Sequence, residues 1–319
     1  MKYAIFGATG AVGKSLAREL ARSGESFRVV GRSLETLQKE FGPYAPRVEN
    51  VVADLADPAA AKTAARGVET IFYTAGVPYT RFADHPVLMR NTIEAAVAEG
   101  VRHLVHVATV YPFGRARTAL VNEDHPREPH TFKGRMRKEQ EDLVLAANGR
   151  GGLRTTLLRA PDFYGADSEL SYVASIFKAA VSGGRANVIG PIDEPHEFVY
   201  VPDLARTLVQ LSRENAAYGH AWNLAGPGQI TERDFMQRVF NAAGRKPRFM
   251  VAGPLMMKVA GLFNPMAREV AEMQYLFSQP LMLDDARLRA LLPNLTKTSY
   301  DEGIRETVEE LKARESGTR

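Results

Sequence analysis

A glycine-rich turn within the first thirteen residues constrains the fold of this chain more than any other stretch. Residues 7–13 read Gly-Ala-Thr-Gly-Ala-Val-Gly, after the apolar run 3–6 and before residues 14–23, where apolar side chains recur at helical spacing. In a strand–turn–helix unit the glycines let the chain reverse, let the backbone approach a pyrophosphate and let the helix pack on the strand. The helix N-terminus then presents free N–H groups to the phosphates. We predict a dinucleotide site rather than a plain turn, with contacts from Gly7, Thr9, Gly10, Ala11, Val12 and Gly13.

Composition excludes several classes of protein. The 319 residues suffice for one large domain or two interleaved ones, and 45% hydrophobic with 24% charged residues is ordinary for a globular enzyme. Without cysteine there is no disulfide or thiol site, and the histidines lack ligand spacing, so we expect no metal. The net charge of +4 comes from scattered basic residues, so we expect no nucleic-acid partner. No run approaches the roughly 20 apolar residues of a membrane span, and we expect a cytoplasmic location with no signal peptide and no membrane partner.

Strand-like and helix-like segments alternate after the glycine turn. Apolar runs at 27–30, 48–53, 70–73 and 102–107 are separated by helical patterns at 34–41, 59–66 and 85–99. Such alternation is typical of βαβ units with a parallel sheet. We therefore predict an α/β fold, a Rossmann-type doubly wound sheet whose strand ends are covered by a smaller C-terminal substrate-binding cap. The expected boundaries are 1–165 for the NAD(P)-binding domain, completed by about 196–226, and 166–195 with 227–319 for the cap.

Residues at the strand ends predict which dinucleotide binds. Arg32 and Ser33 follow the second strand, where an acidic residue would bind the 2′-hydroxyl of NAD and an arginine accommodates a 2′-phosphate. Arg32 therefore favours NADP (NADPH) over NAD, unless it is an exposed arginine without a ligand. Asp54 and Leu55 are expected near the adenine, since a capping role suits Asp57 before its proline better. The remaining expected cofactor contacts are small residues at strand tips, namely Thr74, Ala75, Gly76 and Ala108.

Several stretches, taken together, resemble one known family. They are the glycine turn, Arg32, Asp54-Leu55, Thr74-Ala75-Gly76, and residues 106–114, 158–165, 197–205 and 222–226. In this combination the chain resembles the short-chain dehydrogenase/reductase superfamily, in particular its extended branch, the NAD-dependent epimerase/dehydratase family. The resemblance covers residues 1 to about 240 and implies a nicotinamide cofactor and oxidoreductase chemistry.

The chain departs from this family at the residues that the resemblance makes catalytic. That family uses a Ser or Thr, a Tyr that transfers a proton to or from the substrate oxygen, and a Lys four residues later that lowers the pKa of the Tyr. Thr109 falls on the Ser/Thr position. In the helix over 131–147, Lys133 stands where the tyrosine belongs and Arg137 where the lysine belongs. His85 likewise stands where the family often has an asparagine.

A second resemblance concerns the same helix. The spacing Lys133-x-x-x-Arg137-Lys138-x-x-Glu141 is similar to the lysine helix of the isoflavone-reductase-like and NmrA-like branch, whose reductases use NADPH. It implies that Lys133 handles the proton and that Arg137 lowers its pKa and touches the ribose. Spacing of four places both on one helix face, which could instead be a solvated basic face with Glu141 as partner. Tyr111 could supply the missing phenol, or it is an aromatic packed at a turn.

The C-terminal part bears on the substrate. Residues 250–277 are rich in Met, Leu and Phe, which could line an adaptable apolar pocket or form ordinary helical core. We expect NADPH-dependent hydride transfer to a carbonyl or conjugated double bond of a small, partly apolar substrate, with Thr109 orienting its oxygen. One alternative is a nucleotide-sugar epimerase or dehydratase, with phosphates bound by Arg185, Arg245, Lys246 or Arg248. Another is a non-catalytic NADP-sensing regulator. By analogy with the extended family we also expect a possible homodimer through the helices over 85–99 and 131–147.

Overall fold

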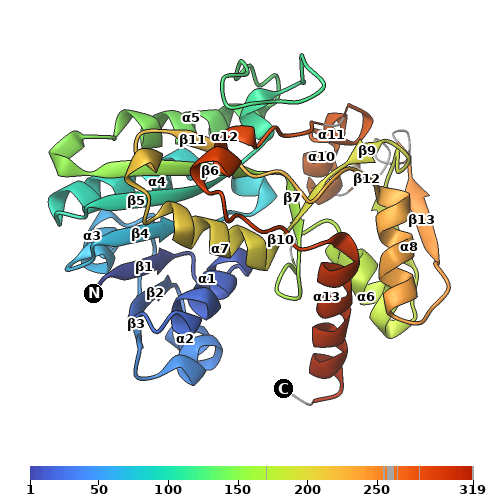
Figure 1. Cartoon of the computed structure of the whole chain (residues 1–319), viewed down its shortest axis with the longest axis horizontal. Coiled ribbons are helices and arrows are strands. Elements are labelled where there is room, and N and C mark those ends of the chain that lie inside the picture. Colours follow the sequence, from blue (N-terminus) through green and yellow to red (C-terminus); the bar gives the residue numbers. More distant parts are fainter. Residues whose placement is uncertain (170, 254–255, 257–261, 264, 280, 318–319) are drawn as a thin grey trace.

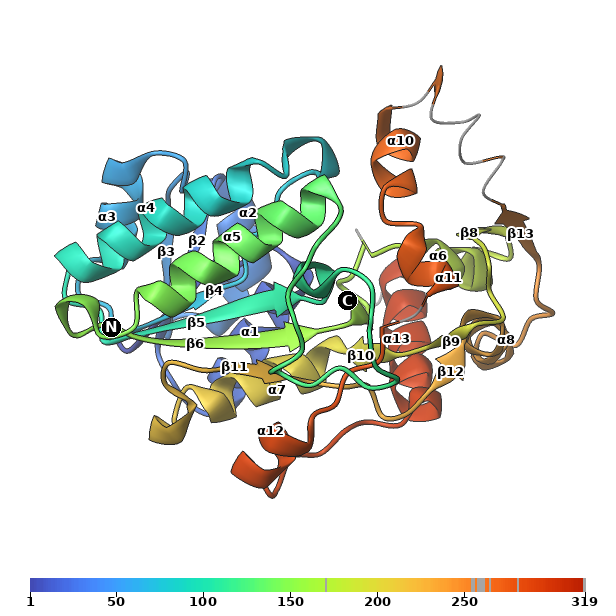
Figure 2. The same cartoon turned by 90° about the horizontal axis from the view of Figure 1, so that it is seen from above.

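The computed structural model has two parts, a parallel sheet covered by helices and a smaller cap of helices and short strands beside it (Figures 1 and 2). The structure describes residues 1–169, 171–253, 256, 262–263, 265–279 and 281–317. The cap lies at the carboxyl ends of the sheet strands, the edge at which open α/β sheets bind ligands.

All seven strands of the main sheet are parallel, as the alternating pattern predicts. Their order is β11-β6-β5-β4-β1-β2-β3, and Phe6 pairs with Val30 on one side and Tyr73 on the other. The order reverses between β1 and β4, which is the switch point where such sheets open a crevice for a ligand. The strands are β1 (Tyr3–Phe6), β2 (Phe27–Gly31), β3 (Val48–Val52), β4 (Thr70–Tyr73), β5 (His103–Thr109), β6 (Arg154–Ala160) and β11 (Ala221–Asn223).

Helices cover both faces of this sheet (Figure 2). One face carries α1 (Ala11–Arg22), α2 (Leu34–Phe41), α7 (Val201–Leu211) and α12 (Ala286–Leu291), and the other carries α3 (Pro58–Ala65), α4 (Asp84–Ala98) and α5 (Phe132–Ala146). Every side chain of β1 is buried, as expected for a strand covered on both sides. The chain returns to the sheet late, because Leu288 of α12 is buried in the same core as α1 and α7.

The cap is assembled from short elements around an aromatic core. Phe198 and Phe235 lie 4.4 Å apart between ring centroids, and Tyr164, Phe177 and Tyr300 pack around them. Its helices are α6 (Ala174–Ser182), α8 (Glu232–Ala242), α10 (Pro265–Ala271), α11 (Tyr275–Ser278) and α13 (Tyr300–Glu315). Its strand pairs are β7 (Asp162–Tyr164) with β10 (Phe198–Tyr200), β8 (Ala186–Ile189) with β13 (Phe249–Ala252), and β9 (Pro195–His196) with β12 (Ile230–Thr231).

Short 3-10 helices occupy several connections. They are η1 (Gly42–Tyr44), η2 (Tyr79–Arg81), η3 (Tyr111–Phe113), η4 (Arg150–Gly152) and η5 (Asn215–Ala217). Two of them, η2 and η3, follow β4 and β5 and so lie at the carboxyl edge of the sheet. They carry two of the aromatic side chains of the candidate site.

Candidate active site

The glycine turn has the geometry that a pyrophosphate site requires. Gly7 has a φ of +88°, and a Cβ there would lie 2.5 Å from the Cα of Ala75, while a Cβ on Gly13 would lie 2.5 Å from the carbonyl oxygen of Ala8. Both positions therefore need glycine to keep the turn against β4 and the helix against the turn. At Gly10 the nearest protein atom to such a Cβ is 3.5 Å away, so this glycine leaves room on the outer side of the turn.

Backbone donors face that space from the start of α1. The first helical hydrogen bond runs from Lys14 N–H to the carbonyl of Gly10 at 2.9 Å. The N–H groups of Ala11, Val12 and Gly13 therefore have no acceptor within the helix. Gly10 is the N-cap without a side-chain cap, and the first turn holds no acidic residue. These open donors and the helix dipole fit the diphosphate of a dinucleotide, and the unfilled space beside Gly10 admits it.

The predicted adenosine contacts are exposed around the ends of β2 and β3. Arg32 is exposed and makes no hydrogen bond or ion pair within the described part of the chain. Ser33 caps α2 by accepting from Thr36 N–H at 3.2 Å, so its hydroxyl already has a structural partner. Asp54 accepts from Ala56 N–H at 3.0 Å in a local turn, while Leu55 is buried.

The small residues at the ends of β4 and β5 lie against the turn. The hydroxyl of Thr74 donates to the carbonyls of Phe6 or Gly7, both at 3.1 Å, and so fixes the end of β1. Ala75 is the residue that Gly7 approaches, whereas Gly76 is exposed and has no atom near its missing Cβ. The glycine turn and the tip of β4 therefore form one continuous backbone surface at the switch point.

Thr109 ends β5 and opens a hydroxyl-bearing part of the site. Its Oγ1 accepts from Tyr111 N–H at 3.4 Å where the chain turns into η3, and the Tyr111 hydroxyl lies 2.8 Å from the hydroxyl of Tyr79 on η2. Burial raises the pKa of Tyr79 and raises that of Tyr111 well above its usual range, so both phenols are protonated at neutral pH. Tyr111 is thus both a packed aromatic, stacked on Phe82, and half of a phenol pair.

Lys133 is buried at the N-terminus of α5, and the interpretation of a solvated basic face is wrong. Its side chain is 0% exposed, and its ammonium pairs with Glu269 of α10 and, at 2.6 Å, with Glu272. Glu272 also accepts from the Lys133 backbone N–H at 3.0 Å. The ammonium lies 5.7 Å from the ring centroid of Tyr79 and so faces the phenol pair.

Arg137 shares the buried face with Lys133, as the spacing of four predicts, but it is anchored elsewhere. Its guanidinium lies 3.2 Å from Nδ1 of His85 and donates to the carbonyl of Val107 at 3.3 Å. Burial and the charge of Arg137 lower the pKa of His85 to about 2, so the imidazole is neutral and can accept this hydrogen bond. Glu141, the suggested partner, instead forms a buried ion pair with Arg159 at 2.8 Å.

A second polar group faces the site from the cap side. Asp162 begins β7, and its Oδ2 lies 3.0 Å from Nε2 of His196, which in turn lies 3.3 Å from the hydroxyl of Tyr172. The ring of Phe277 stacks parallel to that of His196 at 6.4 Å. After burial and the neighbouring Tyr79, the charge of Asp162 also contributes to the raised pKa of Tyr111.

The apolar segment 250–277 divides between core and surface. Met273, Tyr275 and Leu276 are buried against Val110 and Phe113 near the site, whereas Met256, Leu262 and Phe263 are exposed. Residues 254–255, 257–261 and 264 of this segment lie outside the described residues. The buried members support the helical-core interpretation, and Phe277 beside His196 supplies an aromatic wall.

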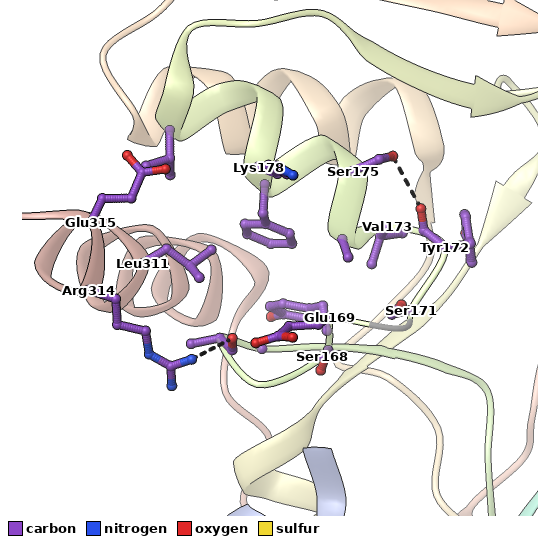
Figure 3. Close-up of a pocket in the computed structure, with 16 residues that line it drawn as sticks. Ser168, Glu169, Ser171, Tyr172, Val173, Ser175, Lys178, Leu311, Arg314 and Glu315 are labelled. Carbon is purple, nitrogen blue, oxygen red and sulfur yellow. Dashed lines mark hydrogen bonds between the residues drawn. The ribbon is translucent and has the colours of Figure 1, made fainter. Parts of the chain in front are cut away.

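Two hollows lie in the cap, and the larger one adjoins the site through Tyr172. A cavity of about 710 Å³ lies between α6, α13 and residues 164–175, with Leu311 of α13 facing α6 (Figure 3). None of the predicted site residues lines it. A smaller hollow of about 250 Å³ is lined by Arg245, Lys246, Arg248 and neighbouring residues at the ends of α6 and α8. The basic residues available for a sugar nucleotide therefore gather away from Asp162 and Lys133.

Sequence reasoning did not find Tyr79, Glu269, Glu272 or the role of His196. Glu269 and Glu272 left one usable signal, since they are the acidic residues of the otherwise apolar segment 250–277 and are spaced three apart on one helix face. The described residues contain no group of His, Asp and Glu that could hold a metal ion. No described helix is long and apolar enough to cross a membrane.

Comparison with known proteins agrees with this geometry. The sequence model of the NAD dependent epimerase/dehydratase family matches residues 3–225. The chain is similar to 3beta-hydroxysteroid-dehydrogenase/decarboxylase isoform 2 of Arabidopsis thaliana, with 24% identity over 82% of this chain and 52% of the plant protein. It therefore spans about half the length of that relative.

A bacterial relative and a solved structure extend the comparison. A probable dTDP-4,6-dihydroxy-2-methyloxan-3-one 4-ketoreductase of Streptomyces antibioticus is 29% identical over 77% of this chain and 79% of its own length. UDP-glucuronic acid 4-epimerase of Bacillus cereus, solved in complex with NAD, superposes with a TM-score of 0.81 at 15% identity, over 99% of this chain and 98% of its own. The names of these relatives are those of enzymes, and the superposition shows the shared fold.

Proposed function

The chain belongs to the NAD-dependent epimerase/dehydratase family, and from that premise we propose that it is an NADPH-dependent oxidoreductase. Its substrate is a small, partly apolar molecule with a carbonyl group or a conjugated double bond to be reduced. One observation carries this proposal: the phenol pair of Tyr79 and Tyr111 lies beside the Lys133 ammonium and Thr109, at the same sheet edge as the glycine turn.

The preference for NADPH rests on Arg32. Its guanidinium is exposed at the end of β2 and has no partner within the described residues, so it is free to pair with a 2′-phosphate. The solved relatives hold NAD, and a neutral ribose would leave this guanidinium unpaired. In this proposal Thr9 adds a hydroxyl contact, and so does Ser33, whose hydroxyl can still donate while it accepts from Thr36 N–H.

The chain's own residues account for the proton. When bound, the nicotinamide supplies the hydride, and the substrate oxygen then needs a proton. We assign that proton to the Tyr111 hydroxyl, with Thr109 donating a hydrogen bond that orients the oxygen. Tyr79 holds Tyr111 in place, and the Lys133 ammonium packs over the ring of Tyr79. Arg137 positions β5 through the carbonyl of Val107, and its positive charge, which acts to lower the pKa of both phenols, favours the phenolate left after transfer.

Cofactor titration tests the first part of the proposal. NADPH, NADP, NADH and NAD are titrated into the wild-type protein and into Arg32→Ala. We expect tighter binding of the phosphorylated pair and a loss of about tenfold or more for that pair alone in the variant. Equal affinity of Arg32→Ala and wild type for NADPH would refute the NADP assignment.

NADPH consumption with a panel of ketones and enones tests the second part. Turnover that falls strongly in Tyr111→Phe supports the proton assignment, and unchanged turnover in Lys133→Met would remove Lys133 from it. Binding of NADPH without consumption of any compound would instead favour the non-catalytic sensor.

A nucleotide-sugar epimerase or dehydratase is the second candidate, favoured by the fold shared with UDP-glucuronic acid 4-epimerase. The chain's own residues oppose it. The cations that a diphosphate needs surround the small hollow at Arg245 and Arg248, whereas Asp162 and Glu232 lie on the cap side of the site. Binding of a uridine or thymidine diphosphate sugar with the affinity of NADPH would reverse this preference.

A further inference from the structure

We infer that Asp162, held by His196, is a specificity-determining residue that binds a hydroxyl or amine group of the substrate and excludes phosphorylated and carboxylated substrates. The inference rests on the proposed function of the site, because it names the class of substrate that this site takes. It concerns a different set of residues from the proton-transfer group, since Asp162, His196 and Tyr172 all lie on the cap side.

The course of the chain brings Asp162 next to the reacting end of the site. Thr109 at the end of β5 pairs with Ala160 at the end of β6, and Asp162 follows Ala160 by two residues. Besides burial, the charge of Asp162 raises the pKa of Tyr111 on the sheet side and of Tyr172 on the cap side. Asp162 therefore lies where the chain leaves the end of β6 and enters the cap, beside the strand end that carries Thr109.

The carboxylate is held in one orientation and still has an acceptor to offer. Its Oδ2 accepts from Nε2 of His196 at 3.0 Å, and that imidazole packs edge-on against the ring of Tyr172 and parallel to the ring of Phe277. Among the described residues nothing donates to the other oxygen, Oδ1, and the Asp162 side chain is 32% exposed. A fixed, partly exposed carboxylate oxygen is an acceptor for an O–H or N–H of a ligand.

The charges around Asp162 make this side of the site unfavourable for an anion. Phosphate and carboxylate groups are recognised by arginine, lysine or backbone N–H donors. Lys133 is committed to Glu269 and Glu272, and Arg137 to His85 and the carbonyl of Val107.

A further carboxyl group lies on the same side of the site. Glu232 is 3% exposed, and its Oε1 has no hydrogen-bond partner among the described residues. Burial raises its pKa, and the charge of Asp162 raises it further. Because its raised pKa leaves Glu232 protonated at neutral pH, the charge that a phosphate would meet here is that of Asp162, without a free cation to offset it. A neutral substrate with a hydroxyl near its carbonyl meets no such repulsion.

Reduction of three related ketones tests the inference. The probes are 2-hydroxycyclohexanone, cyclohexanone and the phosphate ester of 2-hydroxycyclohexanone, each with saturating NADPH. In the wild type we expect kcat/KM to rank hydroxyketone first, ketone second and phosphate ester last. In Asp162→Asn, which preserves the side-chain shape, the ratio of hydroxyketone to ketone falls about tenfold, mainly through KM, and the disadvantage of the phosphate ester shrinks.

Two further variants control this experiment. His196→Gln should lower the same ratio less, because the carboxylate remains but loses its fixed orientation. Asp193→Asn removes another cap carboxylate, exposed and paired with Arg233, and should leave the ratio unchanged. A wild-type preference for the phosphate ester, or equal losses on all three ketones in Asp162→Asn, would overturn the inference.

A binding measurement separates this inference from the proposed function. If no ketone is reduced, the proposed function fails. Calorimetric titration of the NADP-bound protein with cyclohexane-1,2-diol and with its monophosphate then still tests ligand binding by Asp162. Tighter binding of the diol, lost in Asp162→Asn, supports the role of Asp162. Tighter binding of the monophosphate contradicts it.

Discussion

The two halves of the site are built in different ways. On the nucleotide side the contacts are backbone groups within one short segment, the turn over residues 7–13 and the tip of β4 that it touches. On the substrate side they are side chains from separate segments, such as Lys133 with Glu269, which are 136 positions apart. A site made of backbone groups from one segment can be predicted from consecutive residues, whereas a site made of distant side chains depends on the whole fold.

The largest expected effect comes from a substitution in the glycine turn, on the nucleotide side of the site. Gly7→Ala places a Cβ 2.5 Å from the backbone of Ala75 at a φ of +88°, and so should destabilise the protein by about 3 kcal/mol or more in urea unfolding. Gly10→Ala meets nothing within 3.5 Å, so its unfolding free energy should change by less than about 1 kcal/mol while NADPH binding weakens. Equal stability of the two variants would show that the turn tolerates what its geometry forbids.

The next effect concerns the side-chain half. Tyr111→Phe removes the assigned proton donor, so kcat should fall roughly a hundredfold to ten-thousandfold while the Kd for NADPH is unchanged. Tyr79→Phe removes only the hydrogen bond that orients Tyr111 and should cost about tenfold in kcat. Tyr218→Phe, which packs on His103, is the control expected to keep full activity. A larger loss in Tyr79→Phe than in Tyr111→Phe would exchange the two roles.

A moderate effect tests whether the cap stabilises the buried lysine. Glu272→Gln removes one carboxylate from the Lys133 ammonium, and the free energy of unfolding should fall by about 1–3 kcal/mol, since Glu269 remains. Lys138→Met breaks a more exposed ion pair with Asp142 on the same helix and should change stability by less than about 0.5 kcal/mol. If both variants unfold alike, the contact between α10 and α5 contributes no more than a surface pair.

A last effect, of similar size, appears only as a pH dependence. Burial raises the pKa of Glu232 to about 8 from an unperturbed value of 4.5, so the folded protein holds a proton that the unfolded chain releases between these pH values. Stability from this group is therefore present below pH 4.5 and is lost as the pH rises through 8. Glu232→Gln should flatten the decline in unfolding free energy between pH 5 and pH 9 by roughly 1–3 kcal/mol. The exposed Glu194→Gln should show the wild-type slope.

The fold could be predicted from the sequence because its evidence is local. The bounds of β1 and α2 follow from apolar periodicity, and the parallel direction of the sheet strands follows from the alternation of strand and helix patterns. The chain after β7 becomes helical only at Ala174, because the carbonyls of Ser168 and Ser171 accept the hydrogen bonds of two successive turns before α6. Apolar periodicity does not distinguish such turns from a helix end.

The substrate side could be predicted only in part. Helical spacing correctly places Lys133 and Arg137 on one buried face, and Thr109 lies at the end of β5, while its role stays a prediction. Their partners could not be found in this way, because the positions of Tyr79, His196 and Glu272 relative to them are decided by packing between segments. The sequence contains these residues but no periodic relation that joins them.

One hydrogen bond described above makes the contact between the two parts of the molecule measurable by amide hydrogen exchange. The amide of Lys133 belongs to the first turn of α5 and has no acceptor in its own helix, so its hydrogen bond goes to Glu272 of the opposite part. Its hydrogen is protected from exchange with deuterium while this bond between the two parts is made. The exchange of one amide hydrogen therefore reports how often the cap releases the start of α5.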